Sequence, residues 1–143
     1  AGLVAITPAA GFVDVTGALA IGAGAGALCF VAVAFVKSKL GYDDALDAFG
    51  VHGVGGLWGA IATGVFATTA VNGAGADGLL YGGTGLILKQ LIASGVTIGY
   101  SLAGTFLLLK LVDVLVGLRV SEHEERIGLD LSQHREAGYT MLQ

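Results

Sequence analysis

"VTGALAIGAGAGALCFVAVAFV", residues 15–36, is a run of 22 residues without a charged side chain. Lys37 and Lys39 follow it almost directly. Because about 20 apolar residues in a helix are enough to cross the hydrocarbon core of a bilayer, the run predicts a transmembrane helix with a cationic end. The fold class that it predicts is an all-α membrane protein.

The composition of the whole chain agrees with that class. Of its 143 residues, 55% are hydrophobic and 13% are charged, whereas soluble domains carry about 25% charged residues. The 25 glycines against one proline are typical of closely packed membrane helices. The net charge is −4 and the sequence holds no basic cluster that could bind phosphates, so we expect no nucleic-acid partner.

Two further apolar segments predict two more spans, at residues 48–69 and around an uncharged centre at residues 91–109. The helical pattern of the last one extends over about 84–117. The connection at 70–80 is rich in glycine and contains Asn and Asp, which predicts a loop. The chain is therefore expected to contain three full transmembrane helices.

Small residues recur along the first predicted span. Ala18, Gly22 and Gly26 lie four positions apart, which predicts a face along which another helix can approach closely. Cys29 is the single cysteine and lies in the same span, so the chain has no internal disulfide framework.

The basic residues outside the spans predict the orientation of the chain. They follow the first span and the third span, at Lys37, Lys39, Arg119, Arg126 and Arg135. The 70–80 loop has none. By the positive-inside rule, the 37–47 connection and the C-terminus are expected in the cytoplasm.

The sequence predicts three regions. Residues 1–11, "AGLVAITPAAG", are already apolar, and Pro8 would end a helix there, so we expect the end of a span whose beginning is missing, followed by an outer loop. Residues 12–119 contain the three spans, and residues 120–143 form a polar cytoplasmic tail. The chain is thus expected to be a C-terminal fragment.

The tail has its own local signals. Ser121 and Glu124 have the spacing of a capping box, which predicts the start of a short helix. Gly128 is expected to end that helix in a left-handed turn.

One histidine lies inside the second predicted span. In "FGVHGVGG", residues 49–56, His52 shares its helical face with small residues, among them Gly56. An ionisable residue within a bilayer indicates a functional site. A neutral imidazole offers one donor and one acceptor, so His52 can line a path for a small polar molecule without a fixed charge. The alternative is a structural histidine that its neighbours satisfy.

Asp43, Asp44 and Asp47 leave two interpretations open. "DDALD" matches the DDxxD pattern of metal-dependent prenyl-chain enzymes, but the second acidic cluster and the basic residues that such an enzyme needs are absent from the sequence. Carboxylates at the start of a helix more simply cap its free N–H groups and complement its dipole. We expect Asp44 and Asp47 to cap the second span or to lie at a pore mouth, with no metal and no cofactor.

The segment "DDALDAFGVHGVGGLWGAIATGVFA", residues 43–67, strongly resembles the ammonium transporters of the Amt/Mep/Rh family. Residues 1–11 and "LVGLRV", residues 115–120, resemble the same family in the same order. The resemblance covers essentially the whole chain.

The resemblance implies a plasma-membrane transporter and not an enzyme. It implies a homotrimer of eleven-helix protomers, each with one pore and two inverted repeats, to which this chain would contribute the end of helix eight, helices nine to eleven and the cytoplasmic tail. Ammonium would lose a proton at the outer mouth and pass inward as ammonia along paired imidazoles. An ammonium sensor of the same fold is the alternative.

The resemblance also assigns residues. His52 would be the second pore histidine, with Gly56 beside it, and Thr7 matches a threonine near the outer recruitment site. Asp47 matches an aspartate at the cytoplasmic start of helix ten.

The tail resembles that of the bacterial and archaeal members. Its candidates for holding the tail at the cytoplasmic face, where a PII-type signalling protein would dock, are Gly128, Asp130, His134, Glu136 and Tyr139. Arg135 stands where the family favours glycine, so a positive φ at this position would strain the backbone.

Overall fold

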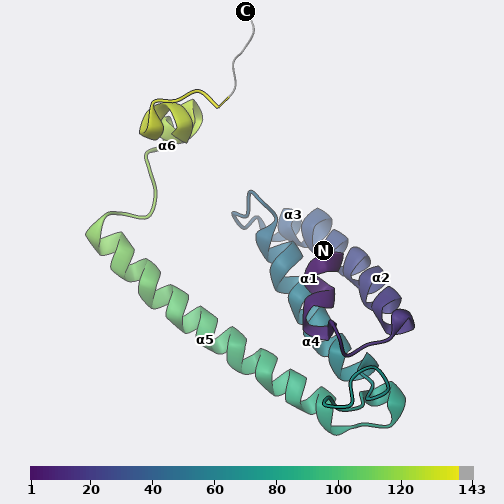
Figure 1. Ribbon diagram of the computed structural model, residues 1–143. Helices are drawn as coiled ribbons and strands as arrows, with labels where there is room; N and C mark the ends of the chain where they lie inside the picture. Colours follow the sequence, from purple (N-terminus) through teal and green to yellow (C-terminus); the bar gives the residue numbers. More distant parts are fainter. Residues whose placement is uncertain (139–143) are drawn as a thin grey trace, which may run out of the picture. The chain divides into compact units, whose positions relative to one another are not determined.

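The structure of the protein is a computed structural model that describes residues 1–138 (Figure 1). These residues form helices and no strand, with a single antiparallel bridge between Val13 and Ala67. Within them, three helices are long and apolar enough to cross a membrane, at Val15–Leu40, Phe49–Phe66 and Gly85–Leu115. The three predicted spans are confirmed.

The first span consists of three segments that follow one another without a break. They are α2 (Val15–Val31), the π-helical turn η2 (Ala32–Val36) and α3 (Lys37–Leu40). Asp14 begins the span, because its carboxylate accepts the backbone N–H of Gly17 at 2.8 Å. Gly41 ends it at a φ of 64°.

The second span also begins with a π-helical turn, η3 (Phe49–Gly53), and continues as α4 (Val54–Phe66). After the 3-10 turn η4 (Leu79–Tyr81), the third span is the single helix α5 (Gly85–Leu115). With 31 residues, α5 is roughly 46 Å long. It therefore exceeds a hydrocarbon core of about 30 Å and has to tilt or protrude.

The N-terminal residues form the short helix α1 (Gly2–Ile6) and the 3-10 turn η1 (Thr7–Ala9). As the sequence predicts, the α-helix ends before Pro8, whose ring and missing N–H cannot continue it.

Helices α1, α2 and α4 pack on one another (Figure 1). The core between them consists mainly of small residues, namely Ala5, Ala9, Ile21, Ala25 and Ala62. Among the described residues, Ile21 is the only large side chain that is fully buried. Lipid tails are as apolar as these side chains, so close van der Waals contact between backbones holds the helices together.

The face that α2 buries differs from the predicted one by one residue. Its buried residues are Gly17, Ile21, Ala25 and Cys29. A Cβ atom added at Gly22 or Gly26 would meet no atom of the described residues within 4 Å. The contact between α2 and α4 is instead set by Trp58, whose ring lies against Gly24 and whose indole N–H donates to the Ile21 carbonyl at 2.9 Å. The predicted contact face was therefore wrong for packing within this chain.

The chain divides into two compact units, residues 1–98 and 99–143, with the boundary inside α5. The second unit contains two short tail elements, α6 (Glu122–Ile127) and the π-helical turn η5 (Asp130–His134). The capping box of Ser121 and Glu124 is confirmed, and α6 ends at Gly128 as predicted. The φ of 104° and ψ of 138° at Gly128 differ from the expected left-handed helical turn, because the chain leaves α6 in an extended direction.

Candidate functional site

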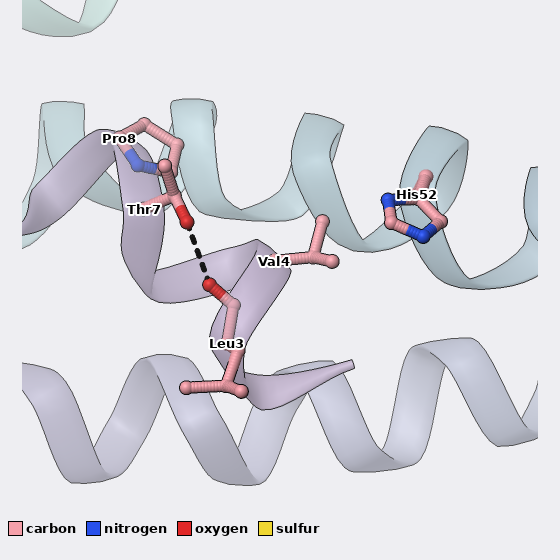
Figure 2. A pocket seen from close by; sticks show the side chains of 5 residues that line it. All are labelled: Leu3, Val4, Thr7, Pro8 and His52. Carbon is pink, nitrogen blue, oxygen red and sulfur yellow. Dashed lines mark hydrogen bonds between the residues drawn. The ribbon is translucent and has the colours of Figure 1, made fainter.

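His52 lies at an open concavity between the second span and the N-terminal helix (Figure 2). The concavity has a volume of about 560 Å³. It is lined by Leu3, Val4, Thr7, Pro8 and His52. Figure 2 shows Thr7 and His52 toward opposite ends of this lining, with Val4 between them. Two predicted site residues from distant parts of the sequence therefore share one cavity.

Glycines on α4 allow α1 to lie directly against it. A Cβ atom at Gly59 would overlap the carbonyl oxygen of Ala5, so only glycine permits this approach. One turn earlier, a Cβ atom at Gly56 would lie 3.8 Å from Cγ1 of Val4. The side of α4 toward α1 is therefore bare backbone at Gly59, whereas Gly56 lies within contact range of Val4 but is not among the residues that line the concavity.

The polar side-chain groups of the concavity are a hydroxyl and an imidazole. The Thr7 hydroxyl donates to the Leu3 carbonyl at 2.7 Å, so its oxygen is left as an acceptor. The His52 ring adds one donor and one acceptor when it is neutral. Leu3, Val4 and Pro8 supply an apolar wall. This arrangement offers hydrogen-bonding groups to a small polar molecule.

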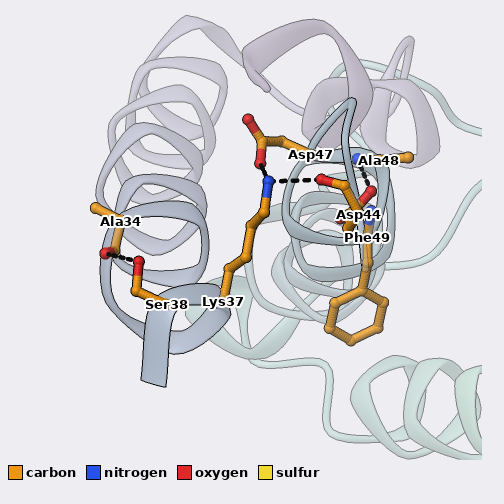
Figure 3. A network of polar contacts seen from close by, with 7 residues as sticks. All are labelled: Ala34, Lys37, Ser38, Asp44, Asp47, Ala48 and Phe49. Atoms are coloured by element: carbon orange, nitrogen blue, oxygen red, sulfur yellow. Dashed lines mark hydrogen bonds and ion pairs between the residues drawn. The ribbon is translucent and has the colours of Figure 1, made fainter. Parts of the chain in front are cut away.

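Asp44 caps the helix that contains His52 (Figure 3). Its two carboxylate oxygens accept the backbone N–H groups of Ala48 at 2.8 Å and Phe49 at 2.9 Å. These N–H groups lie in the first turn, where a helix has no internal partners for them.

Asp47, which the sequence predicts as a helix cap or a pore-mouth residue, forms an ion pair with Lys37 at 2.6 Å. The ammonium group of Lys37 also donates to the Asp44 carbonyl at 2.5 Å (Figure 3). Sequence reasoning missed this role of Lys37. Its partner is ten residues away, beyond a turn, so no helical or strand spacing connects the two.

The acidic residues near this turn do not assemble a metal site. No group of three or more histidine, cysteine or acidic side chains that could hold a metal ion occurs within residues 1–138. The carboxylates of Asp44 and Asp47 are used by a helix cap and an ion pair.

In the tail, the predicted residues gather around Asp130. The Asp130 carboxylate accepts the N–H of Gly138 at 2.9 Å, and its carbonyl accepts the N–H of Glu136 at 3.0 Å. The backbone N–H groups of Gly138 and Leu131 hold the pKa of the Asp130 carboxyl below its usual range. A Cβ atom at Gly128 would lie 2.6 Å from an Asp130 carboxylate oxygen. The sequence from 128 to 138 therefore folds around one carboxylate.

The remaining tail candidates have smaller roles in this geometry. The charge of His134 also lowers the pKa of Asp130. Arg135 has a φ of 57°, which is a left-handed conformation that favours glycine. The family that the sequence resembles favours glycine at this position. Tyr139 lies outside the described residues.

Comparisons with known proteins identify a family that matches this chain. A model of the Ammonium Transporter Family matches residues 1–139. An ammonium transporter of Bacillus subtilis is 56% identical over 139 residues, which cover 97% of this chain and 34% of that protein. Ammonium transporter Amt1 of Archaeoglobus fulgidus is 54% identical over 141 residues, which cover 98% and 35%.

A solved structure has a similar fold over most of this chain. The crystal structure of Saccharomyces cerevisiae Mep2 matches with a TM-score of 0.78 and 36% identity, over 85% of this chain and 29% of that one. The chain spans about a third of the length of the curated relatives it matches. These relatives are named as transporters and not as enzymes, which disfavours the prenyl-enzyme interpretation of "DDALD".

Proposed function

Because this chain belongs to the ammonium transporter family, we propose that it forms part of the path by which ammonium or ammonia crosses a membrane. The chain is a multi-pass membrane protein. The observation that carries the proposal is the concavity where His52 on η3 meets Thr7 on η1 across an apolar lining.

The chemistry of this lining favours a neutral solute. An ammonium ion loses its hydration on entering an apolar passage, and the concavity offers no carboxylate to replace that hydration. Ammonia loses much less hydration free energy on entering the passage, and it can form a hydrogen bond to the His52 ring as donor or acceptor. We therefore propose that a proton is removed at the outer mouth, before the solute reaches His52.

Three residues have roles in this path. His52 is the hydrogen-bonding wall, Gly56 keeps the passage beside it free of side chains, and Thr7 offers a hydroxyl oxygen to the solute. Asp44 and Asp47 lie at the cytoplasmic mouth, where they begin the span that carries His52.

We also propose the assembly in which this path works. The full protein is an eleven-helix protomer with inverted repeats, which forms a homotrimer in the plasma membrane. The exposure of residues 85–98, the part of α5 within the first unit, supports further neighbours, because none of them is buried by the described residues of that unit. The basic residues after the first and third spans support a cytoplasmic C-terminus.

The tail is proposed to regulate transport. Its division from the spans at residue 119 stays a prediction. The compact fold of residues 128–138 around Asp130 supports a defined element that a partner can recognise. A PII-type signalling protein is the proposed partner.

The test replaces His52 in the full-length protein. His52→Ala removes the hydrogen-bonding wall and leaves an apolar void, so ammonium-driven current should be abolished or its selectivity altered. Current is measured across proteoliposomes of equal protein content. Gel filtration in detergent checks that the variant assembles as the wild type does.

His52→Gln provides the matched comparison, because an amide also donates and accepts hydrogen bonds. It should keep more transport than His52→Ala. Wild-type current and selectivity in His52→Ala would show that the histidine is only structural.

A further inference from the structure

Lys37 connects the end of the first span to the start of the second. It lies at the beginning of α3, and its ammonium group bonds both the Asp47 carboxylate at 2.6 Å and the Asp44 carbonyl at 2.5 Å (Figure 3). The Lys37 side chain is 29% exposed and that of Asp47 is 37% exposed, so water partly screens the pair. A screened ion pair contributes little electrostatic free energy, so what matters here is which groups Lys37 holds together.

Asp47 has a backbone conformation that is uncommon for a residue other than glycine. Its φ is 54°, in the left-handed region where a side chain is unfavourable. The Asp47 N–H donates to the Asp44 carbonyl at 3.2 Å, and the Asp47 carbonyl accepts the N–H of Val51 at 2.9 Å. Asp47 is thus the residue at which the chain turns into η3.

Lys37 contacts both parts of this turn. Asp44 caps η3 with its carboxylate while its carbonyl is bonded by Lys37. The second bond of Lys37, to the Asp47 carboxylate, holds the side chain of the residue with the positive φ. The ammonium group of Lys37, at the end of the first span, therefore holds the turn that begins the second span.

The turn determines where His52 lies. His52 follows Asp47 by five residues and belongs to the π-helical turn that begins directly after the cap. A rotation of this turn would move the imidazole relative to Val4 and Thr7, which come from a different element. Tight placement of a functional group tolerates errors of about 1 Å or less.

We propose that Lys37 is a positioning residue for transport, which holds the left-handed turn at Asp47 and thereby sets the position of His52. This inference rests on the proposed function of the His52 cavity. Lys37 itself does not touch the transported solute.

The proposal makes a distinctive claim about Asp47. If Lys37 acts by stabilising a left-handed turn, glycine at position 47 should make Lys37 dispensable, since glycine adopts positive φ without strain. If instead the charge of Asp47 is needed, glycine at this position should impair transport as much as the loss of Lys37 does.

The experiment compares Lys37→Met, Asp47→Gly and the double variant in the full-length protein. For each, we would measure the transport rate per folded protein, the ratio of ammonium to methylammonium permeation, and the thermal unfolding midpoint in detergent. Lys39→Met is the matched control, because Lys39 lies on the same helix end and makes no bond to this turn among the described residues.

We expect Lys37→Met to lower the rate per folded protein by about tenfold and to change the permeation ratio. Asp47→Gly removes a carboxylate at the proposed mouth, so its rate should fall, but less than that of Lys37→Met, and the double variant should match Asp47→Gly. If Lys37→Met does not fold, the test is the rate per folded protein and the permeation ratio of the double variant, which should equal those of Asp47→Gly.

Three outcomes would overturn the proposal. They are a wild-type rate and permeation ratio in Lys37→Met, a lower amount of folded protein with an unchanged rate per protein, and a double variant no better than Lys37→Met.

His52→Ala is measured in parallel. If it transports normally, the proposed function fails, whereas a defect in His52→Ala without one in Lys37→Met removes only the role of Lys37.

Discussion

At the scale of single residues, Gly128 is required for two reasons. Its φ of 104° is unfavourable for any side chain, and a Cβ atom would lie 2.6 Å from an oxygen of Asp130. We predict that Gly128→Asp destabilises the tail locally by about 1–3 kcal/mol and impairs transport in the full-length protein. Amide hydrogen exchange of residues 121–138 measures the first effect and ammonium-driven current the second.

Gly128→Ala is the matched comparison. It introduces the same backbone strain and the same Cβ overlap but no second carboxylate near Asp130, so its effect on exchange should be smaller than that of Gly128→Asp. Normal exchange and normal current in both variants would show that the turn at Gly128 matters neither for the stability of the tail nor for transport.

Asp130 makes the tail sensitive to acid. Its folded pKa lies below the ordinary value of about 3.9, because backbone N–H groups favour the charged carboxylate. The stabilisation is therefore present above that ordinary value and is lost as pH falls through the lowered folded pKa. We predict that exchange protection of the Gly138 amide, which bonds this carboxylate at 2.9 Å, is lost as the pH falls below the ordinary carboxyl pKa and through the lowered folded pKa.

Asp130→Asn is the control for this effect. The amide cannot titrate, so protection of the Gly138 amide should become weak at neutral pH and independent of pH. Protection in the wild type that stays unchanged when the Asp130 carboxylate is protonated would contradict the assignment.

At the scale of elements, the two π-helical turns pack directly on each other. A Cβ atom at Gly50 in η3 would lie 2.6 Å from Cγ2 of Val33 in η2. We predict that Gly50→Ala destabilises the protein by about 1–3 kcal/mol through overpacking and lowers its thermal unfolding midpoint in detergent. Because η3 carries His52, the transport rate should fall as well.

Val33→Ala provides the test of this contact. It removes the clashing methyl groups, so the double variant should recover part of the stability that Gly50→Ala loses. Additive losses in the double variant would show that the two turns do not form the contact described.

At the scale of the whole molecule, the distribution of basic residues predicts the orientation in the membrane. In a full-length protein with cysteines removed, a cysteine at Asn72 should react with an impermeant thiol reagent from outside the cell. A cysteine at Ser38 should react only after permeabilisation. The opposite labelling would refute the proposed orientation together with the proposed cytoplasmic tail.

Features that depend on near neighbours along the chain were predictable from the sequence. The three spans follow from the length of apolar runs, and the capping box at Ser121 follows from a spacing of three residues. The end of α1 before Pro8 follows from the chemistry of proline. In each case the interacting groups lie within a single helical turn or within a single span, so local pattern is sufficient.

The tertiary structure decided the features that join distant residues. The first span is apolar on every side, so its sequence does not indicate which face packs, and the buried face proved to be that of Ile21 and not that of Gly22. The cavity that unites Thr7 and His52, and the bonds from Lys37 to the turn at Asp47, likewise depend on how helices rotate against one another. The sequence by itself determined that three helices cross a membrane and that a histidine lies in one of them. Only packing, in which glycines bring backbones into contact, decided what that histidine faces.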